Sequence, residues 1–447
     1  MKLREAAAAL NLKRPMKARK NGNANKLASE DRAFHDWYRF VLSFPPHLVR
    51  DYVKDFGLTK NSVVLDPFCG TGTTLIESKL LGLKTVGLEA NSFAHFAAST
   101  KLDWDIDSDQ LLAKSRDIAY TALELLRLQG LDDQHSLGKI PKKLRLRTLD
   151  ADTEKLILSN SISPLPLHKT LVLLDCMKEM EKEKYYHHAL LALGNALVYK
   201  ISNLHFGPEV GVRNIKSDVS VVGNWLAEVE KIASDIKSIS GKKYPQSQIY
   251  LGDSREIANF IAPHSIDAVI TSPPYPNEKD YTRTTRLESV LLGFVNSKEE
   301  LRALKKTLVR SNTRGVYKAD DDDKWIDAYP EIQKIAGEIE ERRIALEKNS
   351  GFERLYARVT KLYFGGMARH LADLRQLLRP GAQLAYVVGD QASYLRVMIR
   401  TGELLAKIAV ALGYEHVRTD LFRTRLATAT KEQLREEVVI LRWNKKE

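Results

Sequence analysis

A loop with two glycines, residues 66–74 (Asp-Pro-Phe-Cys-Gly-Thr-Gly-Thr-Thr), has residue types suited to binding a small polar ligand. Gly70 and Gly72 allow a sharp turn and a close approach of the backbone to a ligand, and the amides of a following helix can meet a polar or anionic group. The loop has neither the Gly-Lys-Ser or Gly-Lys-Thr ending of a phosphate loop nor the third glycine of a dinucleotide fingerprint. It therefore favours a nucleoside with a zwitterionic tail.

Two acids lie after later predicted strands and would complete such a site. Glu89 lies 19 positions beyond Gly70, at the end of the second strand, where a carboxylate can accept both hydroxyls of a ribose. Asp253 follows the third strand, where it can accept from the exocyclic amine of an adenine. A purely structural strand–helix turn is the alternative interpretation, and the combination of the loop with both acids disfavours it.

A second loop, residues 271–275 (Thr-Ser-Pro-Pro-Tyr), follows another buried strand. Pro273 and Pro274 stiffen the chain and lack N–H donors, so local carbonyls are left to act as acceptors. The Ser272 hydroxyl and the Pro273 carbonyl can accept from an NH₂ group, and Tyr275 can stack on a planar base. Alone, this loop is equally compatible with a structural proline turn. Beside the first loop it predicts chemistry on an amino group.

Together the two loops resemble the motifs of the amino-group DNA methyltransferases, which use S-adenosylmethionine to methylate cytosine N4 or adenine N6. The resemblance covers about residues 31–104, 246–310 and 352–447. It implies a cytosine-N4 enzyme, since adenine enzymes mostly carry Asp or Asn in place of Ser272. The implied catalytic residues are Ser272, Pro273, Pro274 and Tyr275. The implied cofactor-binding residues are Phe44, Pro45, Asp66, Pro67, Phe68, Gly70, Thr71, Gly72, Thr73, Thr74, Glu89 and Asp253, with no metal.

The reaction that this resemblance implies is an in-line methyl transfer to a nitrogen whose lone pair is delocalised into the base. Acceptors at Ser272 and Pro273 would draw the amine toward a tetrahedral geometry and stabilise its developing positive charge. The target base lies inside duplex DNA, so the enzyme is expected to flip it and stack it on Tyr275. Neither Cys69 nor Cys176 follows a proline, so the thiolate mechanism of carbon-5 methylation is not expected.

Three other functions remain open from the sequence. An adenine-N6 DNA methyltransferase differs only in the base. An RNA guanine-N2 methyltransferase shares the fold and a related proline-proline loop, usually with Asp or Asn in the first position. A non-enzymatic DNA-binding module with a degenerate cofactor fold is the third, and the intact loops disfavour it.

Composition sets the class of protein. The 447 residues are 44% hydrophobic and 28% charged, as in a soluble globular protein with a sizeable core. No apolar run reaches the roughly 18 residues of a membrane-spanning helix. The two cysteines exclude a disulfide scaffold or a multi-cysteine zinc site and are typical of a reducing cytoplasm. The 69 basic and 57 acidic residues give a net charge of +12, which favours a polyanionic partner.

The predicted elements show how the two loops are positioned. Strand, glycine loop, helix, strand and helix follow one another over residues 61–104, and strands recur at 248–251, 266–270, 384–388 and 437–443. This βαβα pattern predicts an α/β fold, a Rossmann-like class I methyltransferase sheet. Helical periodicity over residues 105–245 predicts a large, mostly helical insertion.

Six segments follow from this organisation, and we place their boundaries by composition and periodicity. They are a flexible basic arm (1–30), the core with the cofactor loop (31–104), the helical insertion (105–245), the core with the catalytic loop (246–295), a charged helical segment (296–351) and the C-terminal core (352–447). The acidic run at 320–323 is predicted to be a solvated loop or helix start. Target recognition is open to either the insertion or residues 283–350, and the insertion is also compatible with a scaffold or dimer contact.

Basic residues indicate where DNA phosphates would be neutralised. The candidates are Lys142, Lys143, Arg145 and Arg147 in the insertion, and Arg283 and Arg286 beyond the catalytic loop. Arg283 and Arg286 are equally compatible with structural pairing to nearby acids. The resemblance implies double-stranded DNA and a cognate restriction endonuclease as partners in the cytoplasm, whereas the oligomeric state is not predicted.

Overall fold

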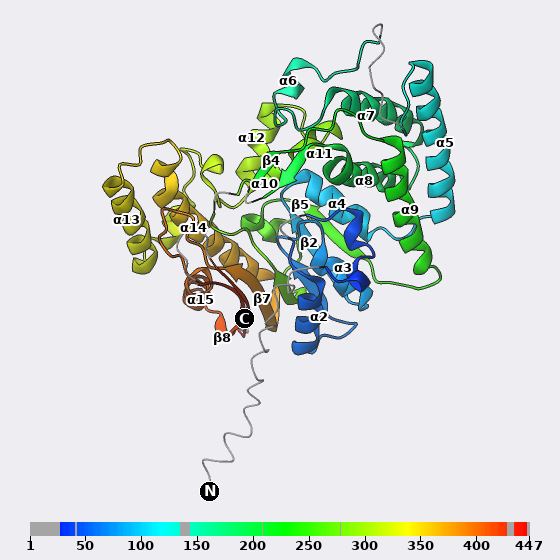
Figure 1. Cartoon of the computed structure of the whole chain (residues 1–447). Helices are drawn as coiled ribbons and strands as arrows, with labels where there is room; N and C mark the ends of the chain where they lie inside the picture. The colour runs from blue at the N-terminus through cyan, green and yellow to red at the C-terminus, as the bar shows by residue number, and fades with distance from the viewer. Residues whose placement is uncertain are drawn as a thin grey trace.

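The computed structural model describes residues 27–40, 43–134, 144–207, 209–277, 279–426 and 433–444 (Figure 1). Most of the predicted basic arm, together with Lys142 and Lys143, lies outside these residues. Within the described part of the chain, every helix is too short or too polar to span a membrane.

A seven-stranded sheet forms the centre of the molecule, in the order β5-β2-β1-β6-β7-β9-β8. Its strands are β1 (Val63–Asp66), β2 (Lys84–Glu89), β5 (Ser247–Leu251), β6 (Ile266–Thr271), β7 (Leu378–Gly389), β8 (Glu415–Leu426) and β9 (Gln433–Trp443). All are parallel except β9, which runs antiparallel to both of its neighbours. The strand order changes direction between β1 and β6, the position where doubly wound sheets bind their ligands. The predicted α/β fold is confirmed.

Helices cover both faces of the sheet, as the alternation of its side chains requires. Leu65 and Val269 point to the face covered by α14 (Tyr356–Leu374) and α15 (Thr401–Ala411). Their chain neighbours Val64 and Ile270 pack with α2 (Pro46–Asp55) on the other face. Two further helices, α3 (Thr73–Leu80) and α4 (Ser92–Leu102), connect β1, β2 and the insertion.

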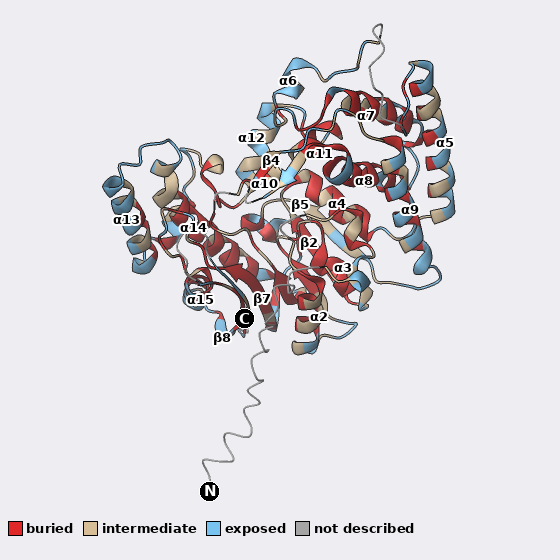
Figure 2. Ribbon diagram, in the orientation of Figure 1, coloured by how far each residue is buried: buried red, intermediate tan, exposed pale blue. Residues whose placement is uncertain are grey.

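The insertion is mostly helical, as predicted. Its helices are α5 (Ser108–Leu128), α6 (Ala151–Glu154), α7 (Pro164–Met177), α8 (Tyr186–Ala196), a π-helical turn (Leu197–Ile201) and α9 (Val222–Ser238). Their apolar sides form one core around Trp225 that continues into Phe93 of α4 (Figure 2). An antiparallel hairpin of β3 (Leu204–Phe206) and β4 (Val210–Val212) was not predicted, because three-residue strands show no usable periodicity.

Two short helices, α10 (Tyr281–Thr284) and α11 (Arg286–Leu291), follow the second loop, and the charged segment after them folds into α12 (Lys298–Thr307) and α13 (Pro330–Ala345). The prediction that its acidic run is a solvated loop or helix start holds in part: a 3-10 helix begins at Asp322 and Asp321 is exposed, but Asp322 is buried. Asp322 is 3% exposed, because the guanidinium of Arg255 lies 2.5 Å from its carboxylate. Gly365 of α14 lets this turn approach closely, since a Cβ at position 365 would lie 1.9 Å from the Asp322 carbonyl oxygen.

Candidate active site

The two predicted loops lie side by side because the strands that precede them, β1 and β6, are neighbours in the sheet. Two hydrogen bonds join them. The Thr271 hydroxyl donates to Asp66 Oδ1 over 2.6 Å, and the Thr74 hydroxyl donates to the Ile270 carbonyl over 3.0 Å. The loops therefore form one structural unit at the carboxyl edge of the sheet.

Asp66 lies beneath the glycine loop and is 1% exposed. Its Oδ1 accepts from the Phe68 amide over 3.1 Å as well as from Thr271. Burial raises the pKa of Asp66 to about 6, although the hydrogen bonds from threonine hydroxyls and the Phe68 amide oppose the shift. In the described contacts this carboxylate shapes the loop and joins it to β6.

Gly70 and Gly72 both adopt positive φ angles, 53° and 89°, which favour glycine. Gly72 caps the N-terminus of α3. A Cβ at Gly70 would meet no atom within 4 Å, so the space above this residue is open. The loop thus combines an open face with the backbone of a helix N-terminus.

Glu89 ends β2 and lies beside this loop. Its two carboxylate oxygens accept from the amides of Gly70 and Asn91, each over 2.8 Å. Burial raises the pKa of Glu89 to about 7, and the backbone hydrogen bonds oppose the shift. Each oxygen of a carboxylate has a further acceptor site, so Glu89 can still accept from ligand hydroxyls.

Asp253 follows β5 and forms a bidentate pair with Arg255, which the sequence did not suggest. The Arg255 Nε and Nη2 atoms lie 3.0 and 2.5 Å from the Asp253 carboxylate. Nη1 of the same arginine lies 2.5 Å from Asp322. Arg255 therefore fixes the Asp253 side chain and connects it to the charged segment.

The predicted catalytic loop, residues 271–275, is positioned by β7. The Ser272 hydroxyl donates to the Val387 carbonyl over 3.2 Å. The Tyr275 ring lies against Gly389, where a Cβ would be 3.0 Å from Cε2 of the ring. The Tyr275 amide donates to the Tyr281 hydroxyl over 3.4 Å, and burial raises the pKa of the Tyr275 phenol above its ordinary value. Gly389 and Tyr281 were missed because their contacts with the loop arise only in the folded chain.

The remaining predicted cofactor residues surround the glycine loop. Phe44 and Pro46 line a small pocket together with Thr71 and Thr73 of the loop. Pro45 lies just before α2 and is buried, as is Pro67. The Phe68 ring makes an edge contact with the buried His370 ring. The structure thus brings these residues together around the carboxyl ends of β1 and β2.

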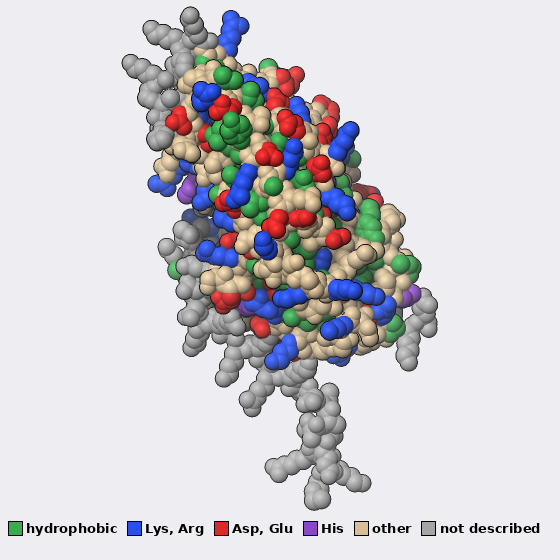
Figure 3. Space-filling view, turned by 90° about the vertical axis from the view of Figure 1, so that its right-hand side faces the viewer, with side chains coloured by type: hydrophobic (Ala, Val, Ile, Leu, Met, Phe, Trp, Pro, Cys, Tyr) green, Lys and Arg blue, Asp and Glu red, His purple; other side chains and the backbone are tan. Residues whose placement is uncertain are grey.

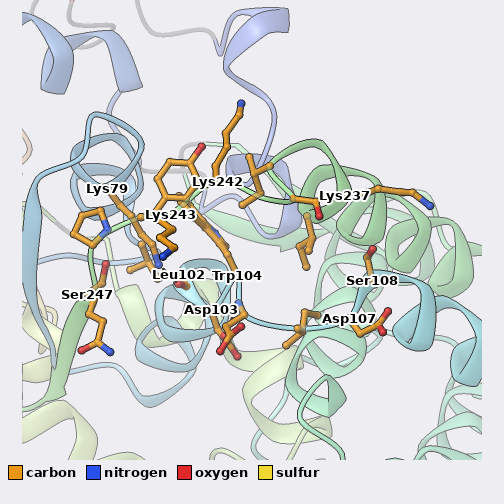
Figure 4. A pocket seen from close by; sticks show the side chains of 18 of the residues that line it. Lys79, Leu102, Asp103, Trp104, Asp107, Ser108, Lys237, Lys242, Lys243 and Ser247 are labelled. Carbon is orange, nitrogen blue, oxygen red and sulfur yellow. Dashed lines mark hydrogen bonds between the residues drawn. The ribbon is translucent and has the colours of Figure 1, made fainter.

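A large pocket lies elsewhere among the described residues, and Figure 4 shows it. Its volume is about 1120 Å³, and Ser247, Trp104, Asp107 and Lys237 are among its lining residues. These residues place it at the amino end of β5, between α4, α5 and α9. Ligands of doubly wound sheets bind outside the carboxyl ends of the strands, so chemistry argues for the two loops and against this pocket.

The predicted phosphate contacts differ in their surroundings. Arg286 donates to the carbonyls of Thr282 and Leu156, and therefore connects the catalytic segment to the insertion. Arg283 lies 3.5 Å from Glu209. In the insertion, Arg145 is exposed and Arg147 pairs with Asp175. Among the described residues, no cluster of three His, Cys, Asp or Glu side chains is arranged to hold a metal ion.

Comparisons with known proteins agree with this geometry. Residues 13–99 match an N6/N4 methyltransferase family described as DNA methylase. Type II methyltransferase M.BsoBI of Geobacillus stearothermophilus is 25% identical over 445 residues, which cover 93% of this chain and 85% of that protein. These matches support the N6/N4 DNA methylase family. Methylases of this family use S-adenosylmethionine, and the open glycine loop with its acceptor carboxylates fits that cofactor.

Two further relatives and one solved structure extend the comparison. Type II methyltransferase M.AvaI, from Nostoc sp. (strain PCC 7120) and from Anabaena variabilis, is 22% identical over 421 residues, which cover 87% of this chain and 80% of the relative. The crystal structure of TrmN from Thermus thermophilus aligns with a TM-score of 0.30 and 11% identity. That alignment covers 92% of this chain and about half, 52%, of the solved chain.

Proposed function

We propose that this protein is a DNA methyltransferase that transfers a methyl group from S-adenosylmethionine to the N4 amine of cytosine in duplex DNA. The observation that carries this proposal is the Ser272–Tyr275 loop, which lies beside the glycine loop and is joined to it through Thr271 and Asp66. Adenine N6 is the second candidate, since the same loop geometry serves either exocyclic amine. Ser272 favours cytosine through the resemblance of the Ser-Pro-Pro-Tyr sequence.

The cofactor, when bound, supplies a methyl group activated on a positively charged sulfur. Glu89 would hold its ribose hydroxyls with the acceptor sites that the two loop amides leave free. Asp253, fixed by Arg255, would accept from the adenine amine. The open backbone at Gly70 and the start of α3 would meet the amino-acid tail.

Ser272 is oriented to accept a hydrogen bond from the target amine. Its hydroxyl proton is directed at the Val387 carbonyl, so the hydroxyl oxygen presents lone pairs to other donors. The Pro273 carbonyl oxygen is a second acceptor, and it carries no proton of its own. Two fixed acceptors would orient the amine and stabilise the positive charge that develops on it.

Tyr275 would hold the flipped base. Its ring is backed by the Gly389 backbone at the end of β7, so the aromatic surface has a fixed position. Stacking on a fixed ring compensates part of the few kcal/mol that unstacking a base costs. The Type II names of the relatives favour a restriction–modification system, and we propose a cognate restriction endonuclease as a partner in the cell.

Mass spectrometry of nucleosides tests this proposal. The protein is expressed in a host without DNA methylation, and plasmid DNA and total RNA are digested separately. N4-methylcytosine is expected in DNA with the wild-type chain and with Tyr120→Ala, an exposed tyrosine of α5, and it is expected to disappear with Tyr275→Ala. N6-methyladenine would instead establish the second candidate. Methylated guanine confined to RNA would overturn the DNA assignment.

A further inference from the structure

The β3–β4 hairpin lies beside the catalytic segment although it belongs to the insertion (Figure 1). Glu209, next to the hairpin turn, lies 3.5 Å from Arg283 and 3.7 Å from Arg314. Arg283 belongs to α10, which follows the catalytic loop. Arg314 follows Ser311, whose carbonyl accepts from the amide of Asn277, two residues after Tyr275. The hairpin therefore borders the catalytic loop.

The base of the hairpin is held firmly. The Asn203 side chain donates to the Asn160 carbonyl and the Ser163 hydroxyl, and its oxygen accepts from the Lys216 amide over 2.8 Å. The Lys216 ammonium donates to the carbonyls of Lys200 and Ser202, each over 2.7 Å. These hydrogen bonds run to backbone carbonyls and not to carboxylates, so they hold the base of the hairpin without adding negative charge.

The outer residues of the hairpin are exposed to solvent. They are His205, Gly207, Arg213, Asn214 and Ile215, and Ile215 is 62% exposed. Among the residues that the structure describes, the Arg213 guanidinium has no acid within ion-pair distance. Lys200, Arg213 and Lys216 belong to the hairpin's flanking residues, and Arg283 and Arg314 of the neighbouring segments both lie near Glu209.

The outer face of the insertion is different. On α5 and α9, Arg116 lies 3.5 Å from Glu230 and Lys237 lies 2.9 Å from Asp109. Figure 3 shows acidic and basic side chains interspersed over the upper part of the side that it presents. Among the described residues, basic side chains outside ion pairs such as Arg213 thus accompany the hairpin, which lies on the side of the predicted catalytic loop.

We infer that the β3–β4 hairpin contacts the major groove of duplex DNA beside the flipped base, with Arg213 directed at base edges and the surrounding cations at phosphates. The major groove admits a two-stranded β-ribbon, and arginine reads guanine there through its bidentate fork. Phosphate contacts from the flanking cations would fix the register of the protein on the duplex. This inference rests on the proposed function and names the segment that recognises the substrate.

The test begins with the wild-type protein in a methylation-free host, where single-molecule sequencing identifies the motif that is methylated. A short duplex with that motif then serves as the binding probe, with S-adenosylmethionine present. Arg213→Ala is expected to weaken binding to this duplex about tenfold or more while the cofactor Kd stays unchanged. Lys242→Ala, an exposed lysine of the same insertion at the amino end of the sheet, is the matched control and is expected to bind like the wild type.

Arg213→Lys distinguishes contacts to bases from contacts to phosphates. The substitution keeps the positive charge and removes the bidentate donors of the guanidinium. If Arg213 reads a base, Arg213→Lys also loses affinity for the motif duplex and keeps its affinity for a scrambled duplex. Wild-type affinity and an unchanged methylated motif in both Arg213 variants would overturn the inference while leaving the proposed function intact. Absence of any methylated motif with the wild-type chain would overturn the proposed function itself.

Discussion

At the carboxyl edge of the sheet, carboxylates have different hydrogen-bond partners in the two halves of the sheet. In the cofactor half, formed by β1, β2, β5 and their loops, Glu89 accepts from two backbone amides, 2.8 Å away. In the base half, formed by β6, β7, β8 and β9, carboxylates accept from arginines. There, Arg400 lies 2.5 Å from Asp390 and Arg423 lies 2.6 Å from Glu436.

This difference suits two different ligands. An amide partner leaves the negative charge of a carboxylate in place, so the cofactor half can attract a ligand with hydroxyl donors and a positive charge. An arginine partner cancels that charge, so the base half suits a neutral, planar base. Asp253 is intermediate, since Arg255 holds it while a second acid, Asp322, shares the same guanidinium.

The largest expected effect comes from removing the acid of the cofactor half. Glu89→Ala loses the acceptor for two ribose hydroxyls and releases the Gly70 amide. Hydrogen bonds to a charged group contribute about 1.5–3 kcal/mol each, so the cofactor Kd is expected to rise roughly a hundredfold or more. Isothermal titration with S-adenosylmethionine measures it, and Asp109→Ala on α5 is the control. An unchanged Kd in Glu89→Ala would contradict the role of this residue.

A smaller effect is expected in the base half. Gly389→Ala places a Cβ 3.0 Å from the Tyr275 ring, which has to shift by a few tenths of an ångström. We expect methyl transfer to slow about tenfold while the cofactor Kd is unchanged, because misplacement of a positioning group reduces the rate steeply. Gly337→Ala in α13 is the control, since its Cβ meets no atom within 4 Å and alanine favours the helix. A parallel loss of cofactor affinity in Gly389→Ala would show that the halves are not separable.

The smallest effect is a pH dependence of the cofactor half. Glu89 has a pKa raised to about 7 in the folded chain, so its acceptor form increases as pH rises through 7. Cofactor affinity is expected to rise about threefold between roughly pH 6.5 and 7.5. The stability of the unliganded protein changes with the opposite sign. The folded state binds the Glu89 proton more tightly than the unfolded state does. The free energy of unfolding is therefore expected to fall as the pH rises from the ordinary pKa of a glutamate toward 7.

Glu89→Gln provides the control for both pH trends, because the amide does not titrate. Its cofactor affinity should be low and flat across this range, and the corresponding part of the stability change should be absent. The measurements are titration calorimetry and thermal unfolding over the same buffers. A wild-type affinity that falls with rising pH would contradict the assignment of Glu89 as an ionised acceptor.

Local sequence was sufficient to predict where the two loops of the candidate site lie, directly after a strand. The glycine loop after β1 and the proline loop after β6 were recognisable because strand, loop and chemistry are contiguous in the chain. The fold was predictable for a similar reason, since the buried strands are short apolar runs. Strand β8 was missed because few of its residues are buried, so it lacks an apolar pattern.

Contacts between distant segments could not be predicted. Arg255 and Asp322 are 67 positions apart, and only the folded chain shows that Asp322 of the acidic run is buried against an arginine. The support of Tyr275 by Gly389 and the position of the β3–β4 hairpin beside α10 depend on packing in the same way. These contacts set the geometry of the site, while the chemical groups were visible in the sequence.

Single-turnover methyl transfer from labelled S-adenosylmethionine to DNA tests the central claim most directly. The wild-type chain is compared with Ser272→Ala/Tyr275→Ala, and the cofactor Kd is measured on the same samples. We expect the double variant to bind the cofactor like the wild type and to transfer label at least about a hundredfold more slowly, as for loss of a fixed electrostatic contact in a transition state. Transfer at the wild-type rate by the double variant would contradict the claim that the Ser272–Tyr275 loop is the catalytic centre.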